Sequence, residues 1–334
     1  MVSIGLIGFG RWGKNHYKAL TDIDGINVPL VCDPLLEERT VGNTKFVKDY
    51  REAIDRDDVD AMIVATHATT HYKISRDLLL SGKHLLVEKP ITTNLRDGKE
   101  LCDIADEKDK VLMVGEIFRF NPAVNYIAKG INDGVIGDVR YFEARRIGLG
   151  PIRHDVNVVW DLASHDFYLS NLFTSSRPET VAGHGVSFNG NVEDVATLAL
   201  KFPGNKFGSI YVNWGHPIKE RTIVIGGTKG AFVFDDVSLT DKVRLYSRGV
   251  DYQPDSAGMV PFLASIRSGD INIPSIDLRS SPLDIEVGHF VKCITQGVHC
   301  VSSGRIGLEA IAILEAAKES MNNKGIEVPV NYAI

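Results

Sequence analysis

The chain has 334 residues, of which 44% are hydrophobic and 24% are charged, and its formal net charge is −6 at pH 7. This length predicts about two domains, each able to bury a core without disulfides or metals. The acidic balance argues against nucleic-acid binding, which needs a basic face.

The four cysteines are scattered, and no C-x-x-C pair or Cys/His cluster has zinc-finger spacing. We therefore expect no metal site. Scattered reduced thiols are typical of a cytoplasmic protein. The opening MVSIGLIGFG lacks a cationic segment followed by a long apolar one, so we read no signal peptide. No apolar run approaches the length of a membrane span.

Short apolar runs alternate with helical patterns through the first 120 residues. The helical patterns cover Thr69–Leu80 and Asn94–Lys108, and the apolar runs are Val2–Ile7, Ile26–Cys32, Asp60–Ala65, His84–Val87 and Val111–Val114. Strands that alternate with helices indicate βαβ units, and strands buried on both faces read as continuous apolar runs. We predict an α/β fold: a Rossmann-type, doubly wound parallel sheet over residues 1–120.

The pattern changes after Asn121-Pro122. A long strand is predicted at Gly137–Ile147, followed by strands at Val195–Phe202, Phe207–Trp214, Arg221–Ile225 and Ala231–Phe234. Short glycine-rich turns join these strands, which indicates an antiparallel sheet. Ser247–Ser281 is predicted as long loops, and helices are predicted at Pro282–Gln296 and Ile306–Met321. The second domain, residues 121–334, is thus an α+β unit with a large open-faced sheet, and we expect the last helix to return toward the first domain.

The first apolar run ends in a glycine-rich turn that fits G-x-G-x-x-G and opens a helix. Gly8 permits the tight turn, Gly10 lets the backbone approach a pyrophosphate, and Gly13 lets helix and strand pack closely. N–H groups at the helix start then hold the phosphates. The expected cofactor contacts here are Gly8, Phe9, Gly10, Arg11, Trp12 and Gly13. The alternative is an ordinary glycine turn before a helix.

Asp33 ends the second apolar run, about twenty residues after Gly13. An acid at this place accepts hydrogen bonds from both ribose hydroxyls of NAD and repels the 2′-phosphate of NADP. Pro34, Leu35 and Leu36 follow, so no arginine is at hand for that phosphate. We therefore expect NAD rather than NADP.

Glu88-Lys89-Pro90 follows the fourth apolar run. In an open α/β sheet the carboxyl ends of the strands line the ligand crevice. Pro90 favours an extended backbone at Lys89, which can aim the ammonium group toward that crevice. The alternative is a surface ion-pair triplet that ends a strand.

Asp161 and His165 are four residues apart in a stretch predicted as a helix, Asn157–Phe173. Residues with this spacing share one helical face, so both side chains can reach one substrate. The alternative for His165 is a histidine of the core or of a helix cap.

These motifs occur in one order along the chain, together with Arg119-Phe120-Asn121-Pro122. The ordered set resembles the glucose-fructose oxidoreductase/inositol dehydrogenase/MocA (Gfo/Idh/MocA) family over nearly the whole chain. The resemblance implies that Lys89 lies beside the nicotinamide and the substrate hydroxyl. It also implies that Glu88 contacts the nicotinamide ribose, and that Asp161 and His165 bind substrate and transfer a proton.

The resemblance extends to a segment that reads T-P-x-x-x-H in the family and Thr66-His67-Ala68-Thr69-Thr70-His71 here. His67 replaces the usual proline, which puts the local loop shape in question. The further cofactor contacts it implies are Thr66, His67, His71 and Asn121, and Arg119 is implied as a substrate contact.

The implied chemistry transfers a hydride from a carbinol carbon to the nicotinamide while the hydroxyl loses its proton. A neutral imidazole at His165 accepts a proton near pH 7. The Lys89 cation stabilises the developing alkoxide. NAD supplies the hydride chemistry, and the catalytic residues expected are Lys89, Asp161 and His165.

The stretch 145–161 resembles the branch of the family that acts on nucleotide-linked sugars, including UDP-N-acetylglucosamine 3-dehydrogenases, as does Trp12-Gly13 in the fingerprint. Arginine forks match phosphate oxygens, so Arg145, Arg146 and Arg153 can hold a diphosphate. Asn157 and Trp160 complete the expected substrate contacts. Salt bridges are the alternative for the arginines. We expect oxidation at C3 of a UDP-linked N-acetylated amino sugar.

Three other functions stay open: a free-polyol dehydrogenase of the inositol or glucose type, a non-catalytic NAD-binding regulator, and a biliverdin-reductase-like enzyme. The intact Lys89, Asp161 and His165 argue against the regulator. An open sheet face usually meets another subunit, so we expect a homodimer or homotetramer through the second sheet.

Overall fold

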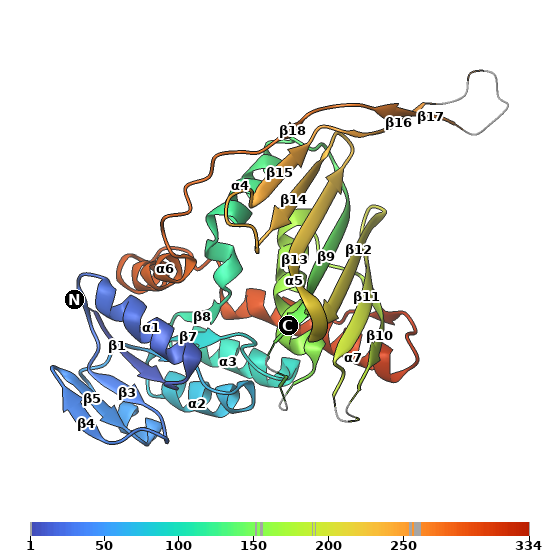
Figure 1. Cartoon of the computed structure of the whole chain (residues 1–334). Coiled ribbons are helices and arrows are strands. Elements are labelled where there is room, and N and C mark those ends of the chain that lie inside the picture. Colours follow the sequence, from blue (N-terminus) through green and yellow to red (C-terminus); the bar gives the residue numbers. More distant parts are fainter. Residues whose placement is uncertain are drawn as a thin grey trace. The chain divides into compact units, whose positions relative to one another are not determined.

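The computed structural model describes residues 2–150, 152–153, 156–188, 190, 192–253, 256 and 262–333. They form two compact units (Figure 1). The first unit comprises Met1–Asn121, Arg279–Glu315 and Tyr332–Ile334, and the second comprises Pro122–Leu278 and Ala316–Asn331. The units are therefore not consecutive blocks: Arg279–Glu315, which sequence analysis assigned to the domain 121–334, groups with the first unit.

The sheet of the first unit is parallel except at one edge. Its strands are β1 (Val2–Ile7), β2 (Ile26–Asn27), β3 (Leu30–Cys32), β4 (Arg39–Val41), β5 (Thr44–Val47), β6 (Ala61–Val64), β7 (His84–Glu88) and β8 (Leu112–Gly115). The order is β4-β5-β3-β1-β6-β7-β8, with β2 also paired to β1 and only β4–β5 antiparallel. This is the predicted doubly wound Rossmann sheet. Its strand order reverses at β1, which places a ligand crevice at the carboxyl ends of the central strands.

The helices of this unit bury one apolar face each. They are α1 (Arg11–Asp22), α2 (Ala68–Leu80), α3 (Leu95–Glu107) and α6 (Pro282–Gln296), with 3₁₀ turns η1 (Tyr50–Ala53) and η2 (Ile117–Phe120). Leu283, Val287 and Phe290 of α6 join the core cluster around β1. The long helix α7 (Gly304–Asn322) is divided between the units after Glu315.

The second unit carries a large, mainly antiparallel sheet. Its strands are β9 (Val139–Leu149), β10 (Thr180–Val186), β11 (Val195–Phe202), β12 (Lys206–Asn213), β13 (Gly215–Gly227), β14 (Ala231–Asp235), β15 (Val243–Tyr246), β18 (Ile271–Asn272) and β19 (Val328–Pro329). Their order is β18-β15-β14-β13-β9-β12-β11-β10-β19, and among these described pairs only β9–β12 is parallel. The turn between β11 and β12 uses Gly204 and Asn205 at positive φ, as the glycine-rich turn predicted.

One face of this sheet is covered and the other is open. Phe142 and Ala144 of β9 are buried on the face that packs against α5 (Ser164–Thr174), while α4 (Pro122–Asn132) packs against β14. Tyr141, which directly precedes Phe142, is 43% exposed, and its partner on the neighbouring strand, Phe207 of β12, is 48% exposed. Side chains of β9 therefore point alternately to a core face and to an open face of the sheet.

The expectation of long loops over Ser247–Ser281 was wrong. This stretch contains β18 and an antiparallel ribbon of β16 (Gly249–Gln253) and β17 (Leu263–Arg267), with residues 254–255 and 257–261 outside the described part. Side chains on both strands of the ribbon are mostly exposed, so no alternation of buried and exposed residues marks it in the sequence.

No helix in the described ranges is both long and apolar enough to span a membrane.

Candidate active site

The glycine turn after β1 has the geometry that close backbone approach requires. Gly8 has φ +93°, and a Cβ there would lie 2.4 Å from the carbonyl oxygen of Ala65. A Cβ on Gly13 would lie 1.9 Å from the carbonyl oxygen of Gly8. A Cβ on Gly10, in contrast, would have no atom within 4 Å among the described residues. Gly10 caps α1 without a side chain, so this helix start is open to an anion.

Asp33 is fastened to this turn. Its Oδ2 accepts a hydrogen bond of 2.7 Å from the backbone N–H of Phe9, and its Oδ1 accepts one of 2.9 Å from that of Leu35. The carboxylate thus sits at the carboxyl ends of β1 and β3, beside the start of α1. A carboxylate oxygen accepts more than one hydrogen bond, so Asp33 retains capacity for a ribose hydroxyl.

The segment after β6 connects to the loop that carries Lys89. Buried His71 of α2 places Nδ1 2.8 Å from the carbonyl oxygen of Pro90 and Nε2 3.2 Å from that of Thr66. His67 caps α2 with φ −72° and ψ 141°, a conformation that proline also adopts. The replacement of proline at this position therefore leaves the loop shape compatible with the family pattern.

Glu88 and Lys89 follow one another at the end of β7. Glu88, whose side chain is 13% exposed, places Oε1 2.8 Å from Nε2 of buried His16 in α1. Burial raises the pKa of Glu88, but the hydrogen bond to His16 and the nearby charges of His16, Lys89 and His71 outweigh it and hold this pKa below its ordinary value. Glu88 is therefore an anion beside Lys89.

A second carboxyl group, which the motifs in the sequence did not predict, lies near Glu88. Glu286 of α6 is 1% exposed, and burial together with the negative charges of Glu88 and Glu116 raises its pKa well above the ordinary value. Its Oε1 has no hydrogen-bond partner among the described residues. Burial and neighbouring negative charges therefore favour the protonated form of Glu286. The signal in the sequence was an acidic residue among the apolar positions of α6.

Arg119 and Asn121 lie at the end of η2, which follows β8. Arg119 is half-buried and Asn121 is buried. Both belong to the first unit, as do the glycine turn, Asp33 and Lys89.

In the second unit, Asp161 and His165 are not on one regular helix. Asp161 lies in a π-helical turn, Val159–Ala163, and His165 lies in the first turn of α5. The prediction of a single helix over Asn157–Phe173 was wrong in this respect, because π turns carry no separate signature in the pattern of apolar residues. Single π turns within helices occur frequently at functional sites. Both side chains are half-buried.

Several side chains hold Asp161 in place. Its Oδ2 accepts a hydrogen bond of 3.1 Å from Nε1 of Trp214, and its Oδ1 lies 3.4 Å from Nη1 of Arg153. Asn157 accepts a hydrogen bond of 3.0 Å from the backbone N–H of Trp160 and donates one of 2.8 Å to Glu193. Arg153, Asn157, Trp160 and Asp161 are thus brought together at the start of this helix.

The neighbouring arginines of β9 have internal partners. Arg146 is 5% exposed and binds Asp166 of α5 through Nη2 at 2.6 Å and through Nε at 3.2 Å. Arg145 points to the other face, where its Nε lies 2.9 Å from Oε2 of Glu220. Both arginines therefore form salt bridges, the alternative expected for them from the sequence.

A Rossmann sheet whose glycine turn opens a helix, with an acid at the end of the next strand, is typical of a dinucleotide-binding protein. A family model described as "Oxidoreductase family, NAD-binding Rossmann fold" matches residues 2–116, and one described as "GFO/IDH/MocA C-terminal domain" matches residues 124–233. The chain belongs to the Gfo/Idh/MocA family of NAD-dependent oxidoreductases that act on CH–OH groups.

Curated relatives span most of the chain. The scyllo-inositol 2-dehydrogenase (NAD(+)) of Bacillus subtilis is 26% identical over 319 residues, which cover 89% of this chain and 87% of that protein. The UDP-N-acetylglucosamine 3-dehydrogenase of Acidithiobacillus ferrooxidans is 25% identical over 289 residues, 84% of this chain and 86% of that protein. The crystal structure of the WlbA dehydrogenase from Bordetella pertussis shares the fold, with a TM-score of 0.79, 20% identity and 99% of each chain covered.

Proposed function

We propose that this chain oxidises C3 of a UDP-linked N-acetylated amino sugar and transfers the hydride to NAD. The observation that carries this proposal is the cation of Arg153 beside Asp161, with Nη1 3.4 Å from Oδ1. A half-buried guanidinium next to a substrate-binding carboxylate suits an anionic group on the substrate, since arginine binds phosphate oxygens in pairs. The A. ferrooxidans relative, which acts on a UDP-sugar, supports the same substrate class.

The residues of the first unit fit NAD. The open backbone at Gly10 and the uncapped start of α1 suit the pyrophosphate, and the acid Asp33 suits the ribose hydroxyls. Glu88 and Lys89 then contact the nicotinamide end of the cofactor. Bound NAD supplies a hydride acceptor at C4 of its nicotinamide ring.

We assign the proton chemistry to Lys89 and His165. The Lys89 ammonium stabilises the alkoxide as the substrate hydroxyl loses its proton, and the neutral imidazole of His165 receives that proton. Asp161, held by Trp214 and Arg153, orients the substrate hydroxyls. One hydride and one proton therefore leave the carbinol group, which becomes a ketone.

The experiment is NADH formation across a panel of UDP-N-acetylglucosamine, its uronic acid, free N-acetylglucosamine, myo-inositol and glucose. We expect turnover to require the diphosphate. Arg153→Ala raises KM for the UDP-sugar about tenfold or more, as loss of a charge-assisted contact of 1.5–3 kcal/mol implies, and changes kcat less. Arg145→Ala, on the open face of the sheet, is the matched control and leaves KM unchanged.

Other outcomes identify the alternatives. Equal or faster oxidation of myo-inositol or glucose supports the free-polyol dehydrogenase, the class of the B. subtilis relative. Tight NAD binding without turnover of any polyol or sugar supports the regulator. A KM that is insensitive to Arg153→Ala contradicts the assigned phosphate contact.

We also propose that the chain forms a homodimer or homotetramer in the cytoplasm. Tyr141 and Phe207 on the open sheet face, and Ile266 at 87% exposure on the ribbon, present apolar surface that a second copy would cover. The free thiols of the four cysteines support a reducing compartment.

A further inference from the structure

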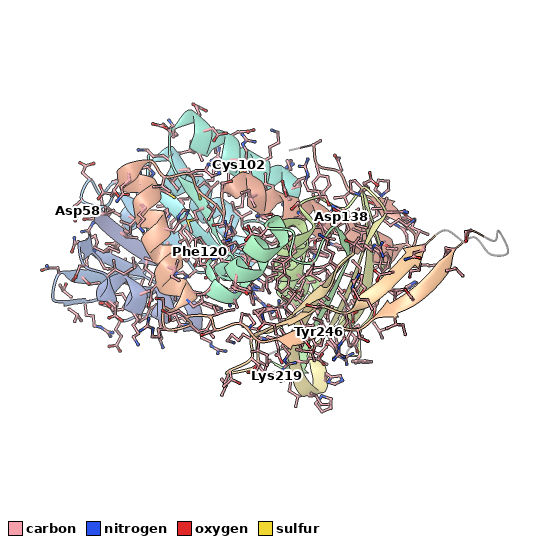
Figure 2. The ribbon with its side chains drawn as sticks, turned by 90° about the horizontal axis from the view of Figure 1, so that it is seen from above. Asp58, Cys102, Phe120, Asp138, Lys219 and Tyr246 are labelled. Atoms are coloured by element: carbon pink, nitrogen blue, oxygen red, sulfur yellow. The ribbon has the colours of Figure 1, made fainter. Side chains whose placement is uncertain are left out.

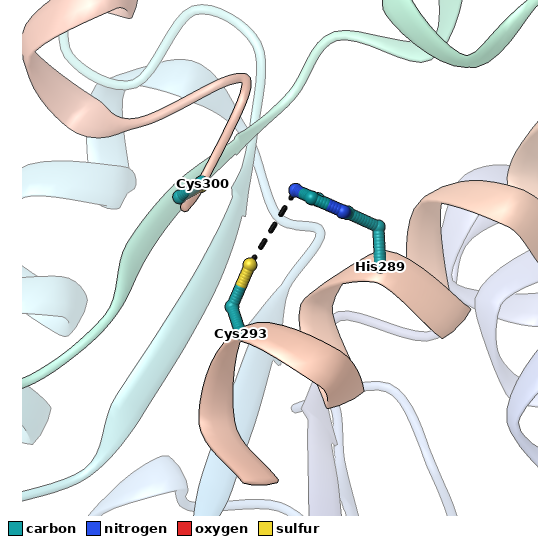
Figure 3. A group of neighbouring side chains, drawn as sticks. All are labelled: His289, Cys293 and Cys300. Atoms are coloured by element: carbon teal, nitrogen blue, oxygen red, sulfur yellow. Dashed lines mark hydrogen bonds between the residues drawn. The ribbon is translucent and has the colours of Figure 1, made fainter. Parts of the chain in front are cut away.

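Three potential metal ligands meet in the first unit, apart from the residues assigned to the reaction. His289 and Cys293 are one turn apart on α6, and Cys300 lies in the segment that leads to α7 (Figure 3). Their ligand atoms all lie within 4.8 Å of one another, and Nε2 of His289 is 3.4 Å from Sγ of Cys293. Their spacing, H-x-x-x-C-x-x-x-x-x-x-C, is not a zinc-finger spacing, so the sequence alone does not predict this cluster.

These distances fit a tetrahedral metal centre. Zinc bonds of about 2.3 Å to sulfur and about 2.0–2.1 Å to nitrogen give tetrahedral edges of roughly 3.6 Å between nitrogen and sulfur and roughly 3.8 Å between two sulfurs. The observed nitrogen–sulfur distance already matches such an edge. Small side-chain movements therefore bring all three atoms to bonding distance of one cation.

The imidazole of His289 is ready to act as a ligand. Burial lowers its pKa, and the positive charges of Arg119, Lys292 and His299 lower it further, so the ring is neutral at pH 7. Its Nε2 accepts a hydrogen bond of 3.2 Å from the backbone N–H of Val301, so the nitrogen that faces the thiols carries a lone pair. A metal ion would take the place of this weak hydrogen bond.

The two thiols favour metal binding over redox chemistry. Burial raises the pKa of Cys300 to about 12 and also raises that of Cys293, so both thiols are protonated and poorly reactive toward oxidants. A coordinated cation deprotonates a thiol directly, and this route needs no free thiolate.

The cluster adjoins a space that can supply a further ligand. Cys293 and Cys300 line a cavity of about 510 Å³, whose wall also includes Cys102 of α3 (labelled in Figure 2) and Asp106. A water molecule from this cavity can complete the fourth position of a tetrahedral site.

We propose that His289, Cys293 and Cys300 bind one borderline-soft divalent cation, of which Zn²⁺ is the representative. Mixed nitrogen and thiolate ligands select this class over Mg²⁺ or Ca²⁺. The site is structural: it fastens the end of α6 to the segment that pairs with β8, where the N–H of Val114 donates to the carbonyl of Ser302 at 2.8 Å. A bound ion would therefore raise the stability of the folded chain.

The test uses the full chain, reduced, freed of metal and titrated with Co²⁺ and then Zn²⁺. We expect one equivalent of Co²⁺ to produce thiolate-to-metal charge-transfer and tetrahedral absorption bands, which Zn²⁺ then removes, and Zn²⁺ to raise Tm. Cys293→Ser and Cys300→Ser abolish the bands. Cys102→Ser, which removes another thiol of the same cavity, is the matched control and retains them.

Wild-type chain without these bands at one equivalent would overturn the proposal, as would bands that survive in both Cys293→Ser and Cys300→Ser. A Cys293–Cys300 disulfide formed by mild peroxide, seen as a loss of two hydrogens in the mass, would show a redox pair in place of a metal site. These readouts do not depend on dehydrogenase activity. The metal-site proposal can therefore fail while the proposed function holds, and the reverse is also true.

Discussion

Lys89 and His165 carry the proposed chemistry at the level of single residues. We predict that Lys89→Ala and His165→Ala each lower kcat by about 100- to 10,000-fold, the range that acid–base and electrostatic groups contribute. NAD affinity, measured by quenching of protein fluorescence, stays within a few fold of wild type. Near-normal turnover in either variant would remove that residue from the mechanism.

Arg146 and Asp166 show how burial fixes the role of a charged residue. Their side chains are 6% and 1% exposed, so removal of one partner breaks a buried ion pair. We predict that Asp166→Ala lowers the free energy of unfolding by about 3–5 kcal/mol, as measured by urea denaturation. Glu220→Ala, which breaks the more exposed pair with Arg145, serves as the comparison and costs less than about 1 kcal/mol. Equal losses would contradict the structural role assigned to the buried pair.

Glu286 gives the stability of the chain a pH dependence. Its pKa is raised well above 4.5 in the folded state, so between that ordinary value and the raised one the folded chain holds a proton that the unfolded chain has released. The contribution of this proton to the free energy of unfolding is therefore complete below about pH 4.5. It is lost as the pH rises toward the pKa of Glu286 in the folded chain. We predict that Glu286→Gln flattens this fall, as measured by urea denaturation from pH 5 to pH 8.

The exposed Glu319 of α7 provides the control for this experiment. Glu319→Gln should keep the wild-type slope of stability against pH. A Glu286→Gln variant with that same slope would show that Glu286 ionises in the folded chain as it does in water. Glu88 acts in the opposite direction, because its lowered pKa contributes stability that is lost as pH falls through the folded value.

At the level of elements, Asp33 joins the end of β3 to the turn between β1 and α1. We predict that Asp33→Ala weakens NAD binding and narrows the preference for NAD over NADP, because it removes both the ribose acceptor and the repulsion of a 2′-phosphate. Dissociation constants for both cofactors, from calorimetric titration, measure this. Asp33→Asn can keep the 2.7 Å hydrogen bond from the backbone N–H of Phe9. This variant therefore separates loss of that hydrogen bond from loss of the negative charge. An unchanged NAD/NADP ratio in both variants would reject the ribose contact.

The elements that sequence analysis predicted well are those with one strong periodic signal. The bounds of α6 agree at both ends with the prediction, and α2 begins one residue before its predicted start. The apolar run Ile26–Cys32 instead divides into β2 and β3 around Pro29, which has no backbone N–H to donate. The ribbon β16–β17 was missed because it buries neither face.

At the scale of the whole molecule, the open face of the second sheet and the apolar ribbon predict self-association. We expect the chain to sediment as a dimer or tetramer. Ile266→Lys, which places a charge on the ribbon, should shift the distribution toward smaller species in analytical ultracentrifugation. Leu239→Lys, at a residue that is 90% exposed outside the ribbon, is the control and should leave it unchanged. A monomeric wild-type chain at micromolar concentration would contradict this expectation.

The sequence by itself determined the fold class, the glycine turn, the family and the order of the site motifs. Each of these depends on local periodicity or on residue types at short spacing, and both are present in the chain before it folds. Only the tertiary structure decided that Arg146 is held by Asp166, that Glu286 is a buried carboxyl group with a raised pKa, and that Cys300 lies close to His289 and Cys293. These features depend on burial and on contacts between segments distant in the chain, because desolvation and the nearness of other charges set the state of an ionisable side chain.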